Sequence, residues 1–207
     1  PISAQSTLED TPRDVAFTVS DADTPLDTLI ITATSSNTTL VPNASLAVAG
    51  SGASRTLTAT PAANRSGTTT VTVVVNDGLT SAQTSFVLTV TAVDDPPTFG
   101  PGVPSAISTV TDTPTTFQVT VNDPDTAGST LTLTATSTTS ALIANTGLTV
   151  TPLASTATSR TFSVTVLPRT GVTGTGGIAL LGEDLTSGVG RAVQVSVTAT
   201  PAVPDPP

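Results

Sequence analysis

The stretch Val-Ala-Phe-Thr-Val-Ser-Asp-Ala-Asp at residues 15–23 returns about 102 residues later as Phe-Gln-Val-Thr-Val-Asn-Asp-Pro-Asp at residues 117–125. In both places, apolar and polar residues alternate and then run into an acidic turn, which is the pattern of a half-buried β-strand followed by a loop. Asp10-Thr11-Pro12 and Asp112-Thr113-Pro114 keep the same offset. An offset of this size fits one β-sandwich domain, so the sequence predicts two copies of one module.

Further alternating segments follow in each copy. They are residues 29–33, 54–60, 69–75 and 85–92 in the first copy, and residues 131–135, 160–166, 178–181 and 192–199 in the second. Turn residues separate them, and no segment has the period of a helix. About seven short strands per copy indicate an all-β chain made of two tandem Greek-key β-sandwiches.

The boundary between the copies is expected at Val93-Asp94-Asp95-Pro96-Pro97-Thr98. The paired prolines lack backbone donors, so the preceding strand cannot continue through them. We therefore predict domains at residues 1–97 and 98–207. Residues 203–207, Val-Pro-Asp-Pro-Pro, repeat the linker pattern, and we expect them to lead into a further domain.

Composition excludes several classes of function. The chain has 15 acidic residues against six arginines, a net charge of -9, and no His, Cys or Lys. Zinc and haem sites, Ser-His and Cys-His nucleophiles, disulfides and lysine Schiff bases therefore lack their residues. Scattered arginines do not predict nucleic-acid binding, and no apolar run is long enough to insert into a membrane. We expect an extracellular protein and no enzyme.

Acidic residues occur in a fixed order along the first copy. They are Glu9, Asp21-Ala22-Asp23, Asp77-Gly78 and Asp94-Asp95-Pro96-Pro97-Thr98-Phe99. Cadherin repeats carry a similar series: a Glu near the end of the first strand, an Asp-x-Asp turn, an Asp-x-Gly turn and an Asn-Asp-x-x-Pro-like linker followed by an aromatic. The chain thus resembles the cadherin-like, or bacterial Ig-like, tandem repeats of large extracellular adhesins, most clearly over residues 1–100. The resemblance implies a location outside the cell or on a bacterial cell surface.

Calcium is the cofactor that the resemblance implies, because Ca²⁺ takes six to eight oxygen ligands in a forgiving geometry. The implied junction site consists of Glu9, Asp94, Asp95, Asp123, Asp125, Glu183 and Asp184. A second implied set, at the upper pole of the first copy, consists of Asp21, Asp23 and Asp77.

Two departures from the cadherin pattern reduce the number of expected ligands. Residues 61–66 offer no carboxylate where cadherins have an acidic segment, and Glu9 becomes Thr111 in the second copy. The alternative interpretation is that the acidic residues cap turns and keep the chain soluble. Both interpretations stay open at the level of sequence.

Three functions compete. The leading hypothesis is a set of non-catalytic spacer repeats in an extracellular multidomain surface protein or adhesin, with neighbouring repeats as partners and calcium stiffening the joint. The first alternative is a subunit that assembles into an extracellular filament through flat Thr- and Val-rich edge strands, which carry no blocking lysine. The second is an accessory binding module, although sugar binding generally uses Trp or Tyr and the chain has neither.

Overall fold

The computed structural model describes residues 1–202, and the predicted linker at residues 203–207 lies outside the described residues. The chain divides into two compact units, Pro1–Val93 and Asp94–Pro207. This division falls before the paired prolines, whereas the sequence places it after Pro97. The reason is that Asp95, before the prolines, already donates its amide to the Asp125 carboxylate of the second unit.

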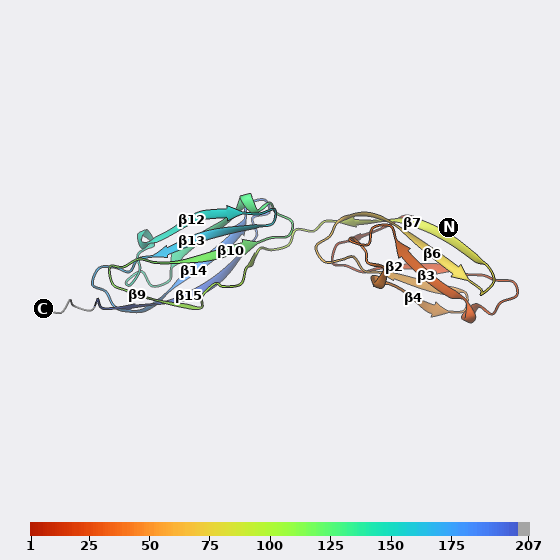
Figure 1. The fold of residues 1–207 in the computed structure, drawn as a ribbon, viewed down its shortest axis with the longest axis horizontal. Coiled ribbons are helices and arrows are strands. Elements are labelled where there is room, and N and C mark those ends of the chain that lie inside the picture. The colour runs from red at the N-terminus through yellow and green to blue at the C-terminus, as the bar shows by residue number, and fades with distance from the viewer. Residues whose placement is uncertain (203–207) are drawn as a thin grey trace. The chain divides into compact units, whose positions relative to one another are not determined.

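The first unit is a sandwich of two sheets (Figure 1). One sheet has the order β1-β7-β6-β3 and the other has the order β2-β5-β4. The strands are β1 (Gln5–Leu8), β2 (Arg13–Thr18), β3 (Ile30–Ser35), β4 (Leu46–Ser51), β5 (Ser54–Ala59), β6 (Gly67–Asn76) and β7 (Ser81–Thr91).

The second unit repeats this arrangement with one strand more. Its sheets have the orders β11-β14-β15-β9 and β12-β13-β10-β8. The strands are β8 (Thr98–Phe99), β9 (Ala106–Val110), β10 (Thr115–Asn122), β11 (Leu131–Ser137), β12 (Leu148–Ser155), β13 (Ser159–Val166), β14 (Gly174–Asp184) and β15 (Gly190–Thr200). This strand order is that of an Ig-like sandwich, and the predicted all-β fold is confirmed.

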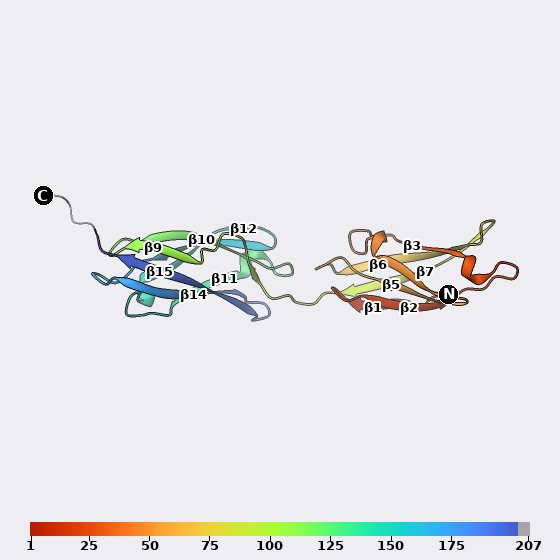
Figure 2. The ribbon, with the colours of Figure 1, turned by 90° about the horizontal axis from the view of Figure 1, so that it is seen from below.

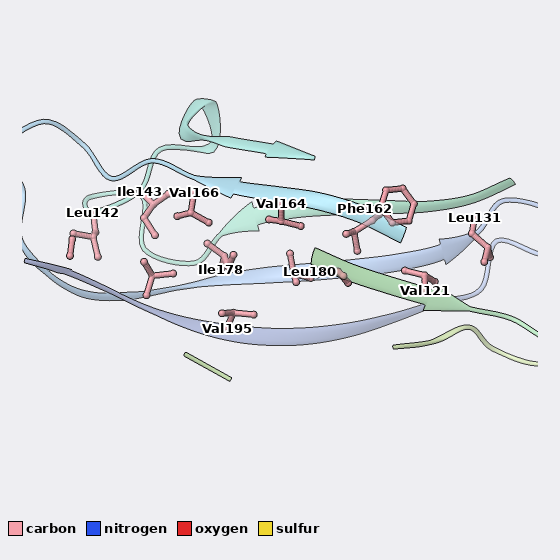
Figure 3. Close-up of a cluster of buried hydrophobic side chains, with 14 residues drawn as sticks. Val121, Leu131, Leu142, Ile143, Phe162, Val164, Val166, Ile178, Leu180 and Val195 are labelled. Carbon is pink, nitrogen blue, oxygen red and sulfur yellow. The ribbon is translucent and has the colours of Figure 1, made fainter. Parts of the chain in front are cut away.

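Alternation along the strands builds a separate core in each unit. In β5, for example, Leu57 and Ala59 are fully buried, while Thr56 and Thr58 are half-buried. Figure 3 shows the second core, where Phe162, Val164 and Val166 of β13 face Ile178 and Leu180 of β14. Burying each Val or Leu contributes about 1.5–3 kcal/mol, so aliphatic side chains hold these sandwiches together almost without aromatics.

In each unit the last strand lies beside a strand from the start of that unit and runs in the same direction. β1 pairs in parallel with β7, from Gln5 opposite Leu88 to Leu8 opposite Thr91. β9 pairs in parallel with β15 over five residues in the second unit (Figure 2). Each sandwich is therefore closed by hydrogen bonds between its two ends.

The repeated Asp-Thr-Pro sequence makes the same turn twice. Asp10 and Asp112 both adopt a positive φ, 57° and 62°, just after β1 and β9. Asp tolerates this left-handed conformation better than most residues, which explains its place before the sharp change of chain direction.

Helical structure within residues 1–202 is limited to three-residue 3₁₀ turns: η1 (Leu26–Thr28), η2 (Asn43–Ser45), η3 (Gly128–Thr130) and η4 (Asn145–Gly147). None of these is long or apolar enough to cross a membrane.

Candidate metal-binding site

The first unit brings Asp21 and Asp77 to one hollow of about 210 Å³. Asp21 follows β2 and Asp77 follows β6, and the hollow is also lined by Leu29 and Val75. Asp23, the third predicted ligand of this set, is exposed on the same loop.

The carboxylate of Asp21 holds its own loop. Its Oδ1 accepts the amides of Asp23 and Thr24 at 3.2 and 2.9 Å, which is an Asx turn. The Thr24 amide contributes most to holding the pKa of Asp21 below its usual value, while the charge of Asp77 opposes this effect. Asp21 is therefore an ionised group that a turn already stabilises.

Asp77 has the same role at the β6–β7 turn. Its Oδ1 accepts the amides of Leu79 and Thr80 at 2.7 and 2.6 Å, and its Oδ2 accepts the Thr80 hydroxyl at 3.0 Å. The amide of Thr80 is the main cause of the lowered pKa of Asp77.

The second unit repeats these turns with the carboxylates more deeply buried. Asp123 Oδ1 accepts the amides of Asp125 and Thr126 at 3.0 and 2.9 Å. Asp184 Oδ1 accepts the Thr186 amide at 2.7 Å, and its Oδ2 accepts the Ser187 amide and hydroxyl at 3.1 and 2.7 Å. Asp123 and Asp184 thus correspond to Asp21 and Asp77.

Burial distinguishes the second set from the first. Asp123 is 1% exposed and Asp184 is 0% exposed, whereas Asp21 and Asp77 are half-buried. Burial acts to raise the pKa of Asp184, but the Ser187 hydroxyl and the turn amides outweigh it and hold the pKa well below its usual value. This carboxylate is therefore charged inside the protein.

Asp123 has one carboxylate oxygen that the turn does not use. Its Oδ2 is buried and has no hydrogen-bond partner among residues 1–202. A buried polar atom without a partner is costly, and a cation or a water molecule would satisfy it. This oxygen is the most direct structural indication of a ligand in either unit.

The linker residues Asp94 and Asp95 belong to the second unit and differ in their surroundings. Asp94 is exposed, whereas Asp95 is half-buried, and its amide donates to Asp125 Oδ2 at 2.9 Å. The linker backbone is thereby fixed to the loop that carries Asp123.

Glu9 belongs to the first unit, where it is 3% exposed. Its amide donates to the Thr91 carbonyl at 2.9 Å, and its Oε1 accepts the Val93 amide at 2.6 Å. Both bonds extend the β1–β7 ladder beyond its last strand pair, so Glu9 holds the end of β7.

Glu183 lies within β14, opposite Thr132 of β11. Successive side chains of a strand point to opposite faces, so Glu183 and Asp184 do not share a face. Among the residues that the structure describes, no group of three or more acidic side chains converges as a preformed metal cage. Of the predicted ligands, Asp21 and Asp77 line one hollow, whereas Asp123 and Asp184 each cap their own turn and Asp94 and Asp95 lie on the adjoining linker.

Two arginines that hold loops, Arg55 buried and Arg160 half-buried, were not among the predicted site residues. Arg55 is 6% exposed and donates to the Leu26 carbonyl at 2.8 Å, with Asp27 at 3.9 Å. Arg160 donates to the carbonyls of Ser129 and Leu131, and its guanidinium lies 5.4 Å from the centre of the Phe162 ring. Each arginine fixes the loop that contains η1 or η3. The sequence could have indicated this role, because side chains alternate between the two faces of a strand. Both arginines occupy positions on the same face as the core residues of β5 and β13.

No family model and no curated protein matches the sequence. Similar solved structures include the titin domains Z1Z2 in complex with telethonin, at 12% identity and a TM-score of 0.40, covering 98% of this chain and 95% of that one. The S-layer protein rSbsC matches at 22% identity and a TM-score of 0.40, covering 84% of this chain and 20% of that one. An endo-fucoidan hydrolase of glycoside hydrolase family 107 matches at 16% identity and a TM-score of 0.38, covering 98% of this chain and 28% of that one. This chain thus spans only a small part of the hydrolase and of the S-layer protein, and scores this low support no functional conclusion. The strand order itself identifies the chain as a tandem pair of Ig-like β-sandwich repeats.

Proposed function

We propose that the chain is a pair of non-catalytic spacer repeats in an extracellular multidomain surface protein or adhesin. The observation that carries this proposal is the parallel pairing of β1 with β7 in the first unit and of β9 with β15 in the second. A pull on the two ends of such a unit shears the whole ladder at once, so all its hydrogen bonds resist together. This arrangement suits a spacer that transmits load.

The loop carboxylates support a non-catalytic role. Asp21, Asp77, Asp123 and Asp184 each accept two or more hydrogen bonds from their own turns. Those bonds hold the pKa values of Asp21, Asp77 and Asp184 low, the opposite of the raised value that a general acid needs.

Single-molecule stretching of residues 1–207 tests the spacer role. We expect two unfolding events, releasing about 300 Å of chain from the first unit and about 350 Å from the second, because their strands span residues 5–91 and 98–200 and an extended chain measures about 3.3–3.6 Å per residue. Proline in place of Thr7 in β1 removes an amide from the clamp and should lower the force of the first unit only. Equal forces before and after that change would contradict a load-bearing clamp.

We further propose that calcium binds at the linker end of the second unit and stiffens the joint. The unpartnered Oδ2 of Asp123 and the buried charge of Asp184 support this proposal, since oxygen-rich sites of net negative charge suit Ca²⁺. Asp94 and Asp95 lie on the adjoining linker and supply further oxygens. Glu9 is retained as a candidate ligand, although its Oε1 already accepts a hydrogen bond.

Calorimetry tests the calcium site. The double change Asp95→Asn and Asp123→Asn should weaken calcium binding far more than Asp21→Asn, because carboxylate charge drives binding in oxygen-ligand sites. Scattering with and without chelator should show a more variable particle after calcium removal. Equal losses from both sets would contradict the site, and the absence of calcium heat in the parent chain would favour the turn-and-solubility interpretation.

Self-association separates the spacer from the filament alternative. A spacer stays monomeric at micromolar concentration, whereas a filament subunit grows through edge strands such as β3 and β4. Light scattering measures the mass and decides between them.

A further inference from the structure

The two units differ at one edge strand. β4 is the last strand of its sheet in the first unit, and β12 has the same place in the second unit (Figure 1). The two strands correspond at the offset of about 102 residues, since Leu46 and Val48 match Leu148 and Val150. Neither strand carries a charged residue. Each therefore has an open side along which another strand can pair, unless something prevents it.

The backbone groups on the open side of β4 follow from its ladder with β5. The Thr60 amide donates to the Ser45 carbonyl at 3.1 Å, which fixes the alternation of the ladder. Every second residue after Ser45 bonds to β5, so Val48 and Gly50 direct their amides away from it. The carbonyls of Leu46 and Val48 point the same way. The open side of β4 thus presents both donors and acceptors.

The second unit lacks one of these amides. The Leu167 amide donates to the Gly147 carbonyl at 2.8 Å, so the same alternation leaves Val150 and Pro152 facing the open side of β12. Pro152 stands where the first unit has Gly50, and proline has no amide to donate. The register of the ladder also shifts after Pro152. Proline and a bulge both stop an edge strand from pairing, so β12 is protected where β4 is not.

The edges of the opposite sheets, β3 and β11, are closed at their ends in both units. Asn43 Oδ1 accepts the amide of Ser35, the last residue of β3, at 2.8 Å, and Asn145 Oδ1 accepts the amide of Ser137, the last residue of β11, at the same distance. Both amides lie on the side away from the neighbouring strand. An asparagine side chain thus takes the place of an added strand there. Nothing comparable covers the Val48 amide among residues 1–202.

The sequence of β4 is complementary to itself. When a second β4 lies antiparallel about a twofold axis at Val48, the two Val48 residues face each other, Leu46 faces Gly50, and Ala47 faces Ala49. The two Val48 residues then exchange amide-to-carbonyl bonds, and each Gly50 amide meets the Leu46 carbonyl of the other copy. Leu46 is opposed by a residue without a side chain, and no like charges meet across the axis.

From these observations we infer that β4 of the first unit is a contact surface for β4 of a second copy of this chain. The three-stranded sheets of the two copies join edge to edge into one continuous sheet. A twofold contact uses the same edge on both copies and closes on itself, so it yields a dimer and not a filament. The inference goes beyond the proposed spacer role and requires neither load-bearing nor calcium.

The size of the contact sets its strength. A strand of six residues is only about 20 Å long, so we expect a weak dimer with a dissociation constant of about 0.1–1 mM. The chain then stays monomeric at micromolar concentration. Where many copies stand side by side on one surface, their effective concentration reaches the millimolar range, and weak contacts between them add up.

Sedimentation equilibrium and hydrogen exchange of residues 1–207 in chelator test the contact at protein concentrations up to about 1 mM. The mass should rise toward that of a dimer and not beyond it. At about 1 mM, mass action should slow exchange at the Val48 amide by about two- to fivefold relative to the dilute chain. The Val150 amide, at the protected edge of the second unit, is the internal control and should exchange at the same rate at all concentrations.

Charge substitutions test the register of the contact. Ala47→Glu with Ala49→Glu places like charges opposite each other and should weaken dimerisation by about fivefold or more, whereas Ala47→Glu with Ala49→Lys places opposite charges there and should strengthen it. Both positions are exposed, so the core of the unit is left intact. Thr149→Glu with Thr151→Glu is the matched control, because it adds the same charge at the corresponding exposed positions of β12. At physiological ionic strength this control should stay within about twofold of the parent chain.

A mass and a Val48 exchange rate that do not change with concentration would overturn the inference. Equal slowing at Val150, growth beyond a dimer, or equal weakening by the β4 and β12 glutamate pairs would overturn it as well. A Glu-Lys variant that dimerises no better than the Glu-Glu variant would contradict the twofold register. The stretching and calorimetry experiments use dilute chains and are independent of these outcomes, so each proposal can fail separately.

Discussion

Glu9→Ala should lower the free energy of unfolding of the first unit by about 2 kcal/mol. Glu9 is buried, and its Oε1 accepts the Val93 amide at 2.6 Å. Alanine retains the backbone bond from residue 9 to Thr91 but removes this carboxyl acceptor and the side-chain stem. The end of β7 then loses one of its two attachments to residue 9.

The magnitude follows from the parts that are lost. A hydrogen bond contributes about 0.5–1.5 kcal/mol between neutral groups and about 1.5–3 kcal/mol when one partner is charged. Val93 is exposed, so water can reach its freed amide and no further penalty for an unsatisfied group is added. In a unit of this size, about 2 kcal/mol corresponds to a fall of roughly 8–16 °C in the melting temperature.

Urea unfolding in chelator, with hydrogen exchange to resolve the two units, measures the effect. Glu9→Gln is the matched control, because its side-chain carbonyl can still accept the Val93 amide as a neutral group; it should lose about 1 kcal/mol, clearly less than the alanine variant. An alanine variant as stable as the parent in chelator would refute the clamp. A loss that appears only when calcium is present would identify Glu9 as a metal ligand instead.

Two further predictions concern charged groups. The pKa of Asp184 is lower in the folded state than the usual value near 3.9. The ionised carboxylate therefore stabilises the second unit above about pH 4, and this contribution is lost as the pH falls below that value. In Asp184→Asn, the urea midpoint of the second unit should change less between pH 7 and pH 3 than it does in the parent chain. Arg55→Met keeps the apolar stem but leaves the Leu26 carbonyl without its charged donor, which should lower the free energy of unfolding of the first unit by about 1.5–3 kcal/mol. Asp27→Asn should lower it by less than about 1 kcal/mol, because Asp27 is 72% exposed. Urea unfolding of the three variants beside the parent chain measures both effects, and an Asp27 variant as unstable as the Arg55 variant would contradict the second prediction.

The sequence predicts the fold well where alternation is regular. Residues 15–19 and 117–121 fall in or directly after β2 and β10 because every second side chain is apolar and faces the core. The short strand β8 could not be predicted this way, since two residues after paired prolines carry no periodic signal. Its existence depends on a contact with β10 that is distant in the sequence.

Alignment of the acidic turns shows a second limit. Leu79-Thr80-Ser81 matches Leu185-Thr186-Ser187 by identity, which aligns Asp77 with Glu183. The hydrogen bonds instead align Asp77 with Asp184, because each accepts the amides two and three residues later. Turn geometry, rather than residue identity, fixes the register here.

The candidate calcium ligands remain a prediction for a physical reason. Residue types and spacing place carboxylates on neighbouring loops, but an Asx turn and a metal ligand require the same residue at the same position. Only the placement of the second oxygen separates the two roles, and that placement depends on the packing around Asp123.

The pairing of β1 with β7 also sets the order in which the protein can be made. Gln5 contacts Leu88, so the ladder that closes the first unit cannot form until nearly the whole of that unit has been synthesised. Contacts this distant in the sequence also slow folding, since the long intervening loop must be closed first. A chain emerging from a ribosome or a narrow export pore would therefore complete its repeats one at a time, each only when its last strand is free.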